Sequence, residues 1–280
     1  MRHFLVLACL LATAAAATGP ALADSSGELS DPAEMNPFYF RVGTYVLGSS
    51  TAARVDGSGG IIGTQFNFED DLNLDKEKRT LLAGFRWRFA ARHYLEVEYF
   101  NLRRFGSKRL ETEIRFRDEV FPIGIDVDSS FTTEVTRASY AYRLIRKPDW
   151  GLAVSAGIHV TRLQARLEQI TFDNVDRPFA AREIASVTAP LPVIGLNGAW
   201  RLGPKWALVA RGQAFFLEVD DVKGSITHAA AFLEHQTFRH AGFGFGYDWF
   251  DIDVDATDPG WRGAADVRFQ GPMLFVQASF

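Results

Sequence analysis

The chain of 280 residues contains one cysteine, Cys9, so it cannot form an internal disulfide. It has no apolar run of the ~18 residues that a membrane-spanning helix needs in its core. It also lacks an excess of basic charge, because 30 Lys and Arg side chains face 34 Asp and Glu side chains. These absences exclude a disulfide scaffold and a helical membrane protein, and we expect no nucleic-acid partner.

Aromatic residues, by contrast, make up 13% of the chain, and phenylalanine alone occupies 24 positions. The mean hydropathy is nevertheless close to zero. Many aromatics in a chain of neutral hydropathy are typical of strands with one apolar and one polar face. A transmembrane β-barrel needs that mixture.

The N-terminus has the pattern of a secretory signal. A basic start is followed by the apolar stretch Phe4–Leu11, and Ala21–Ala23 forms an A-x-A cleavage pattern before Asp24. Cys9 lies inside the apolar stretch, too early to be a lipidated first residue. We therefore predict a signal peptide over residues 1–23, cleaved after Ala23.

A short polar lead is predicted over residues 24–37 on the periplasmic side, and alternating strands follow over 38–280. Apolar residues recur at every second position, as in Phe38, Phe40 and Val42. Period-two alternation indicates β-strands with one apolar face. We predict an all-β, antiparallel, up-and-down transmembrane β-barrel of about ten strands, with eight or twelve as alternatives, each strand about 9–11 residues long.

The predicted connections alternate in length, except for a short link at Asp220 to Gly224. Short turns are expected at residues 90–93, 146–149, 203–205 and 235–240. Longer connections are expected at residues 49–79, 104–130, 162–186 and 251–263. Short periplasmic turns and long outer loops are typical of bacterial barrels.

Taken together, the signal peptide, the aromatic strands, the alternating connections and the terminal Phe280 resemble the small Gram-negative outer-membrane barrels of the OmpA-like and OmpW-like superfamily. The resemblance implies a bacterial outer-membrane location and contact with outer-membrane lipids and lipopolysaccharide. It also implies that the last strand is the signal read by the barrel-insertion machinery, through Leu274, Val276 and Phe280. We expect a monomer without cofactors, and no peptidoglycan-binding domain after the barrel.

Charged residues on the polar strand faces are expected to point inward, because each would cost roughly 2–4 kcal/mol near the bilayer midplane. The predicted lumen network comprises Arg86, Arg88, Glu96, Glu98, Arg137, Arg143, Arg201 and Arg211. Aromatic residues near the short turns are expected to form an interfacial girdle. They are Trp87, Tyr99, Tyr142, Trp150, Trp200 and Trp206.

Only weak catalytic candidates are present. His159 and Thr161 share one strand face, with Glu168 further along. No spacing of His, Asp or Glu side chains indicates a metal site. A basic cluster of Arg103, Arg104, Lys108 and Arg109 is expected on the outer side of a strand, where it could meet lipopolysaccharide phosphates.

The sequence thus favours a non-enzymatic barrel with a largely plugged lumen and a structural, surface-interaction or narrow-channel role. A lipid-modifying enzyme that acts on lipid A or phospholipid through His159 is the first alternative. A soluble exported β-protein is the second.

Overall fold

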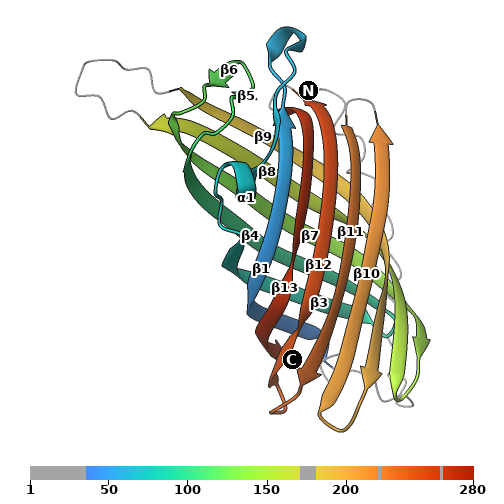
Figure 1. The fold of residues 1–280 in the computed structure, drawn as a ribbon. Helices are drawn as coiled ribbons and strands as arrows, with labels where there is room; N and C mark the ends of the chain where they lie inside the picture. The colour runs from blue at the N-terminus through green and yellow to red at the C-terminus, as the bar shows by residue number, and fades with distance from the viewer. Residues whose placement is uncertain (1–35, 171–180, 220–221, 259–260) are drawn as a thin grey trace.

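The computed structural model describes residues 36–170, 181–219, 222–258 and 261–280, so the expected signal peptide and nearly all of the lead lie outside the described residues. Within the described ranges, ten long strands form an antiparallel sheet that closes through pairing of the first and last strands (Figure 1). These strands are β1 (Phe38–Val55), β3 (Glu77–Ala90), β4 (His93–Arg109), β7 (Asp126–Arg146), β8 (Trp150–Ile170), β9 (Arg182–Arg201), β10 (Trp206–Val219), β11 (Val222–His235), β12 (Ala241–Asp258) and β13 (Trp261–Ser279). The predicted up-and-down barrel of ten strands is confirmed.

The two ends of the barrel differ. Short turns join β3 to β4, β7 to β8, β9 to β10 and β11 to β12 at one end, which we call the short-turn end. The opposite end, which we call the long-loop end, carries the small elements β2 (Gln65–Asn67), α1 (Phe68–Asp71), β5 (Ile114–Phe116) and β6 (Glu119–Phe121). No helix among the described residues is long and apolar enough to cross a membrane.

Many strands are longer than predicted, reaching 21 residues in β7 and β8. The expected long connection at 251–263 is wrong, because β12 continues to Asp258 and β13 begins at Trp261. In this segment Ile252 and Val254 are buried inside the barrel, while the aspartates that alternate with them point outward. The segment is therefore a strand with an apolar inner face.

The outer surface of the short-turn half is apolar. Outward side chains such as Phe40, Phe245 and Val276 are 44%, 47% and 64% exposed, and Leu81 reaches 73%. Exposed apolar side chains recur on most of the ten strands at this level. We call this band the apolar belt.

In the long-loop half the polarity is reversed. Outward positions of the same strands carry charged side chains, including Arg103, Arg162, Asp251 and Arg268. Inward positions there are buried and apolar, and they form one continuous core. The long-loop half thus has an apolar interior and a charged outer surface, as a water-soluble β-barrel has.

Two small elements from the long loops contribute to that core. Phe68 of α1 is fully buried and its ring centroid lies 4.9 Å from that of Phe131 on β7. The β5–β6 hairpin buries Phe116 and Phe121 completely. Asn67 caps α1, since its side-chain oxygen accepts from the backbone N–H groups of Glu69 and Asp70 at 3.0 Å. The barrel is therefore plugged from its long-loop end.

The pairing of β3 with β4 stops at Leu82 and Phe100, although both strands continue toward the long-loop end. The segment after α1 bridges this opening, because the N–H of Asp75 donates to the carbonyl of Phe105 at 3.1 Å. Gly106 allows the close approach, since a Cβ there would lie 2.5 Å from the carbonyl oxygen of Leu72. The loop thus replaces a missing stretch of strand pairing.

Strands β9 and β10 separate in the same way above Ile194 and Ala214. Along β9 the backbone groups of odd-numbered residues face β8, as shown by the bond from Arg201 N to the carbonyl of Asp149. Even-numbered residues therefore face β10, and both Pro190 and Pro192 are even. Because proline has no N–H, it cannot donate to a neighbouring strand, and the pairing ends where these prolines begin.

Replacing both prolines with threonine, as in Pro190→Thr/Pro192→Thr, is expected to extend the pairing of β9 with β10. The continued register would place residue 192 opposite Phe216. Amide hydrogen exchange at Phe216 should slow by at least about tenfold, since its backbone groups would gain a partner. The variant Thr188→Ala leaves an existing N–H on the same edge and should change nothing. Unchanged exchange at Phe216 in the double variant would contradict this account of the opening.

Candidate functional site

The interior of the short-turn half contains a buried charged layer. Alternation along the strands directs these side chains away from the apolar belt and into the lumen. All of them are at most 8% exposed. The charged layer comprises Arg41, Arg86, Glu96, Glu98, Arg137 and Arg211.

Two carboxylates hold the arginines together. Glu96 Oε1 lies 2.9 Å from Arg86 Nε and 3.3 Å from Arg211 Nη2. Glu98 pairs with Arg41, and its Oε2 lies 3.2 Å from Arg137 Nη2. Each carboxylate therefore bridges arginines from different strands, which ties the walls of the barrel together across the lumen.

A chain of polar contacts continues the layer. Tyr45 and His228 both contact Asp248, with Oδ2 lying 2.7 Å from the tyrosine hydroxyl and 3.1 Å from His228 Nε2. His228 Nδ1 lies 3.4 Å from Arg137 Nη1 and 3.5 Å from Gln213 Oε1. His159 Nε2 lies 3.0 Å from Gln213 Oε1.

Aromatic side chains close the lumen directly beyond this chain, on the long-loop side. Phe250 stacks on Phe269 with ring centroids 4.8 Å apart, and Phe100 meets Phe269 edge-on at 5.5 Å. Phe250 also stacks on His159 at 5.6 Å. The charged layer and this aromatic layer follow one another along the barrel axis.

One buried ion pair lies among the apolar side chains of the long-loop half. Arg104, which is fully buried, contacts Glu69 of α1 and the hydroxyl of Thr51. The second oxygen of Glu69 accepts from the backbone N–H of Thr51 at 2.8 Å. This contact fixes the plug element α1 to the walls formed by β1 and β4.

The two long loops also contact each other outside the barrel. Asp118 at the tip of the β5–β6 hairpin accepts from the backbone N–H and the hydroxyl of Ser58, both at 2.7 Å. These hydrogen bonds stabilise the carboxylate and lower the pKa of Asp118 below its ordinary value.

The structure brings most of the predicted lumen residues together. Glu96, Glu98, Arg137, Arg143 and Arg211 are buried in the lumen with Arg86. Arg88 and Arg201, by contrast, are half-buried near the short-turn end.

The basic cluster expected on the outer side of a strand is divided between the two faces of β4. Arg103 and Arg109 are exposed. Arg104 is buried inside the barrel, and the Lys108 amine donates to the carbonyl of Asp70 at 2.9 Å. The expectation of a single outer cluster is wrong, because consecutive residues of a strand point to opposite faces.

Aromatic residues assigned to the girdle lie on the outer face. Trp87, Tyr99 and Trp200 are 41%, 40% and 38% exposed. Tyr142, Trp150 and Trp206 are half-buried close to short turns. Tyr99 lies farther from the turns, next to the charged outer surface, and its hydroxyl donates to Glu134 at 3.1 Å.

The weak catalytic candidates do not converge. His159 and Thr161 are completely buried and face the interior, whereas Glu168 lies on the opposite face of β8 and pairs with Arg166. Among the described residues, no group of three or more His, Cys, Asp or Glu side chains is arranged to hold a metal ion.

Sequence reasoning missed the polar chain around Asp248. Asp248 follows three glycines at alternate positions on the inner face of β12, and His228 alternates with buried Ile226 and Ala230. An aspartate and a histidine on the inner faces of two successive strands could have indicated this contact. The register aligns Asp248 with Ala230, two positions from His228.

Comparison with one solved structure supports the fold, and two others with lower TM-scores are similar over much of the chain. The outer membrane protease OmpT from Escherichia coli aligns with a TM-score of 0.56 over 87% of this chain and 96% of its own, at 9% identity. The translocator domain of the autotransporter NalP from Neisseria meningitidis aligns over 87% of this chain and 89% of its own, with a TM-score of 0.44 and 12% identity. Ail, the attachment invasion locus protein of Yersinia pestis, aligns over 85% and 97%, with a TM-score of 0.34 and 10% identity.

No protein-family model matches the chain, and no curated protein matches it by sequence. At these identities the likeness extends to the fold alone. The expected resemblance to small outer-membrane barrels is confirmed at that level.

Proposed function

We propose that this protein is a bacterial outer-membrane barrel with a closed lumen, which acts through the charged half that projects beyond the bilayer. The observation that carries the proposal is the reversal of polarity along the strands. The apolar belt fits lipid around the short-turn half, and the soluble-like long-loop half fits water. The short-turn end then faces the periplasm, and the long-loop end faces the exterior.

A closed lumen disfavours the narrow-channel role. A solute crossing the barrel would have to pass the charged layer, the aromatic layer and the plug formed by α1 and the β5–β6 hairpin. Side chains fill the interior of barrels of this size. We therefore favour a structural or surface-interaction role, carried by the rigid outer half and its loops.

The location can be tested with one matched pair of variants on β12. Phe245 faces outward in the belt and Asp253 faces outward eight residues further along the strand. Phe245→Arg should lower the stability in lipid by about 2–4 kcal/mol, the cost of a lipid-exposed arginine near the midplane, whereas Asp253→Arg should have little effect. The readouts are fractionation with the outer membrane and a heat-dependent shift in gel migration. Equal effects of both variants, or a wild-type protein in the soluble fraction, would refute the proposed location.

Conductance separates the closed barrel from a channel. The wild-type protein should give no stepwise current in a planar bilayer under conditions in which its heat-dependent gel shift shows it to be folded. Reproducible unit steps would contradict the closed lumen while leaving the membrane location intact.

The lipid-modifying alternative is less well supported by the geometry. A general base must reach its substrate, and His159 is enclosed by Gln213, His228 and Phe250 inside the barrel. The experiment is to measure lipid A and phospholipid in cells that express wild type or His159→Ala. Modification that depends on His159 would establish the enzyme.

Contact with lipopolysaccharide remains part of the proposal. Arg79, Arg103 and Arg162 are exposed near the border between the apolar belt and the charged outer surface, and no ion pair engages them within the described part of the chain. Phosphate groups at that level of an outer leaflet would be suitable partners. Recognition of Leu274, Val276 and Phe280 by the insertion machinery also remains a prediction, and these residues are 57%, 64% and 58% exposed on the outer face.

A further inference from the structure

We propose that the short-turn mouth of the lumen contains a binding site for a small anion. A cavity of about 20 Å³ lies at this end of the charged layer, which is room for about one or two water-sized groups. Four arginines and one glutamate contribute the charged side chains of its lining: Arg86, Arg143, Arg146, Arg211 and Glu96. The lining therefore carries three more positive than negative charges.

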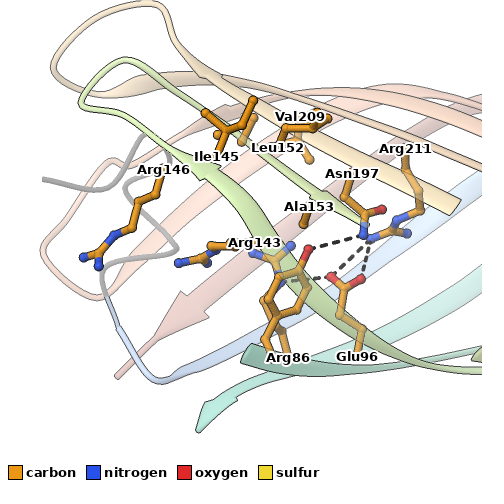
Figure 2. A pocket seen from close by; sticks show the side chains of 14 residues that line it. Arg86, Glu96, Arg143, Ile145, Arg146, Leu152, Ala153, Asn197, Val209 and Arg211 are labelled. Atoms are coloured by element: carbon orange, nitrogen blue, oxygen red, sulfur yellow. Dashed lines mark hydrogen bonds and ion pairs between the residues drawn. The ribbon is translucent and has the colours of Figure 1, made fainter. Parts of the chain in front are cut away.

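A β-bulge in β7 produces part of this concentration of charge. Arg143 and Arg146 are three residues apart, so a regular strand would direct them to opposite faces. The register with β8 shifts between Arg143 and Ile145, and both arginines consequently line the cavity. Figure 2 shows Arg143 directed toward the space between Glu96 and Asn197, while Arg146 extends away from it.

Arg211 supplies donors that the surrounding protein does not use. Its Nη2 lies 3.3 Å from Glu96 Oε1, and its Nη1 lies 3.8 Å from Glu98 Oε2, which is beyond hydrogen-bond distance, so its Nε and Nη1 have no hydrogen-bond acceptor among the described residues. Its side chain is only 3% exposed. Buried guanidinium N–H groups are costly to leave unbonded, and they match the lone pairs of an anion.

The neighbouring arginines are held by an aromatic ring. Arg86 and Arg143 lie 5.5 Å and 5.3 Å from the ring centroid of Tyr94, and this ring also lines the cavity. Cation–π stacking engages the faces of both guanidinium groups and holds them at the cavity. The site is thus preorganised for a planar or spherical anion.

The size of the cavity limits the ligand. It would accept chloride or a carboxylate group, but not a sugar acid in its entirety. The carboxylate could belong to a free small acid or to the end of a larger molecule that enters from the short-turn end. Passage beyond the site is blocked by the aromatic layer, so the anion would bind and leave on the same side.

The experiment follows thermal unfolding of the refolded mature barrel in detergent at constant ionic strength. Sodium chloride, sodium acetate or N-acetylglycine replaces sodium gluconate stepwise. A saturable rise in the unfolding temperature is expected for the small anions, because a ligand that binds only the folded state stabilises it. A response to N-acetylglycine at lower concentration than to acetate would identify the end of a larger molecule as the better ligand.

Variants locate the site. Arg143→Gln should weaken the apparent affinity about tenfold or more, by loss of a charged donor, and Arg146→Gln should weaken it less, by loss of a nearby positive charge. Arg239→Gln removes the same charge from an exposed turn at the same end of the barrel and should leave the affinity unchanged. Because Arg146 is only half-buried, Arg146→Gln is expected to fold even if the buried Arg143→Gln does not.

A crystal grown in bromide should show an anomalous peak between Arg143 and Arg211. The proposal is overturned if the unfolding temperature does not saturate, if both lumen variants respond as wild type does, or if the cavity contains water and no bromide.

Discussion

Arg104→Ala is expected to destabilise the protein by about 3–5 kcal/mol, because it leaves the Glu69 carboxylate buried without its cation. The pair lies among apolar side chains, with Phe131 5.8 Å from the Arg104 guanidinium. The measurement is unfolding by urea in detergent, together with protease cleavage within residues 56–76. Cleavage should become faster because Glu69 belongs to the plug element α1.

The double variant Glu69→Leu/Arg104→Met separates charge from packing. Replacing both members of a buried pair with apolar side chains of similar volume is often neutral or stabilising, so this variant should recover most of the loss. Arg166 and Glu168 form a matched control, as their pair is 40% and 35% exposed, and Arg166→Ala should cost at most about 1 kcal/mol. Equal losses for Arg104→Ala and Arg166→Ala would show that burial does not determine the cost.

The variant Glu96→Ala/Glu98→Ala is expected to have a comparable or larger effect, again at least about 3–5 kcal/mol. It removes both carboxylates that bridge Arg86, Arg137 and Arg211 across the lumen. The remaining arginines would repel one another in a buried layer. The folded fraction should therefore fall in heat-shift gels and in urea titrations.

The half-buried carboxylate Glu134 provides the control for this variant. Glu134 lies on the outer face of β7, and Glu134→Ala should change the stability by at most about 1 kcal/mol. The lumen double variant should still give no current, because the aromatic layer and the plug are unaltered. Wild-type stability of Glu96→Ala/Glu98→Ala would contradict the assigned role of the charged layer.

Much of the barrel could be predicted because alternation constrains a strand at every second residue. Phe40 and Val42 had to face outward if Arg41 faced inward, and the structure places them so. The position of Arg86 opposite Glu96 followed from the short turn between them, since hairpin register depends on turn length. These inferences needed only local sequence.

The long-loop half could not be derived in the same way. The expected strand length came from the thickness of a bilayer, and nothing in that rule covers strands that continue into water. Phe68 and Phe116 fall within the connections predicted over residues 49–79 and 104–130, and their burial results from contacts between segments far apart in the chain. The chain of contacts through Gln213, His228 and Asp248 likewise depends on how the walls face each other across the lumen.

The pairing of β1 with β13 closes the barrel and so encloses the interior of both halves. Fifteen residues of β1, from Tyr39 to Val55, pair along β13. Before these strands pair, Tyr45 of β1 lacks its hydrogen bond with Asp248 of β12, and the apolar side chains Leu47 and Val55 lack those of β13 beside them. In an open sheet, charged side chains at one end and apolar side chains at the other would be exposed without their partners. Pairing of the first strand with the last therefore protects both halves from aggregation.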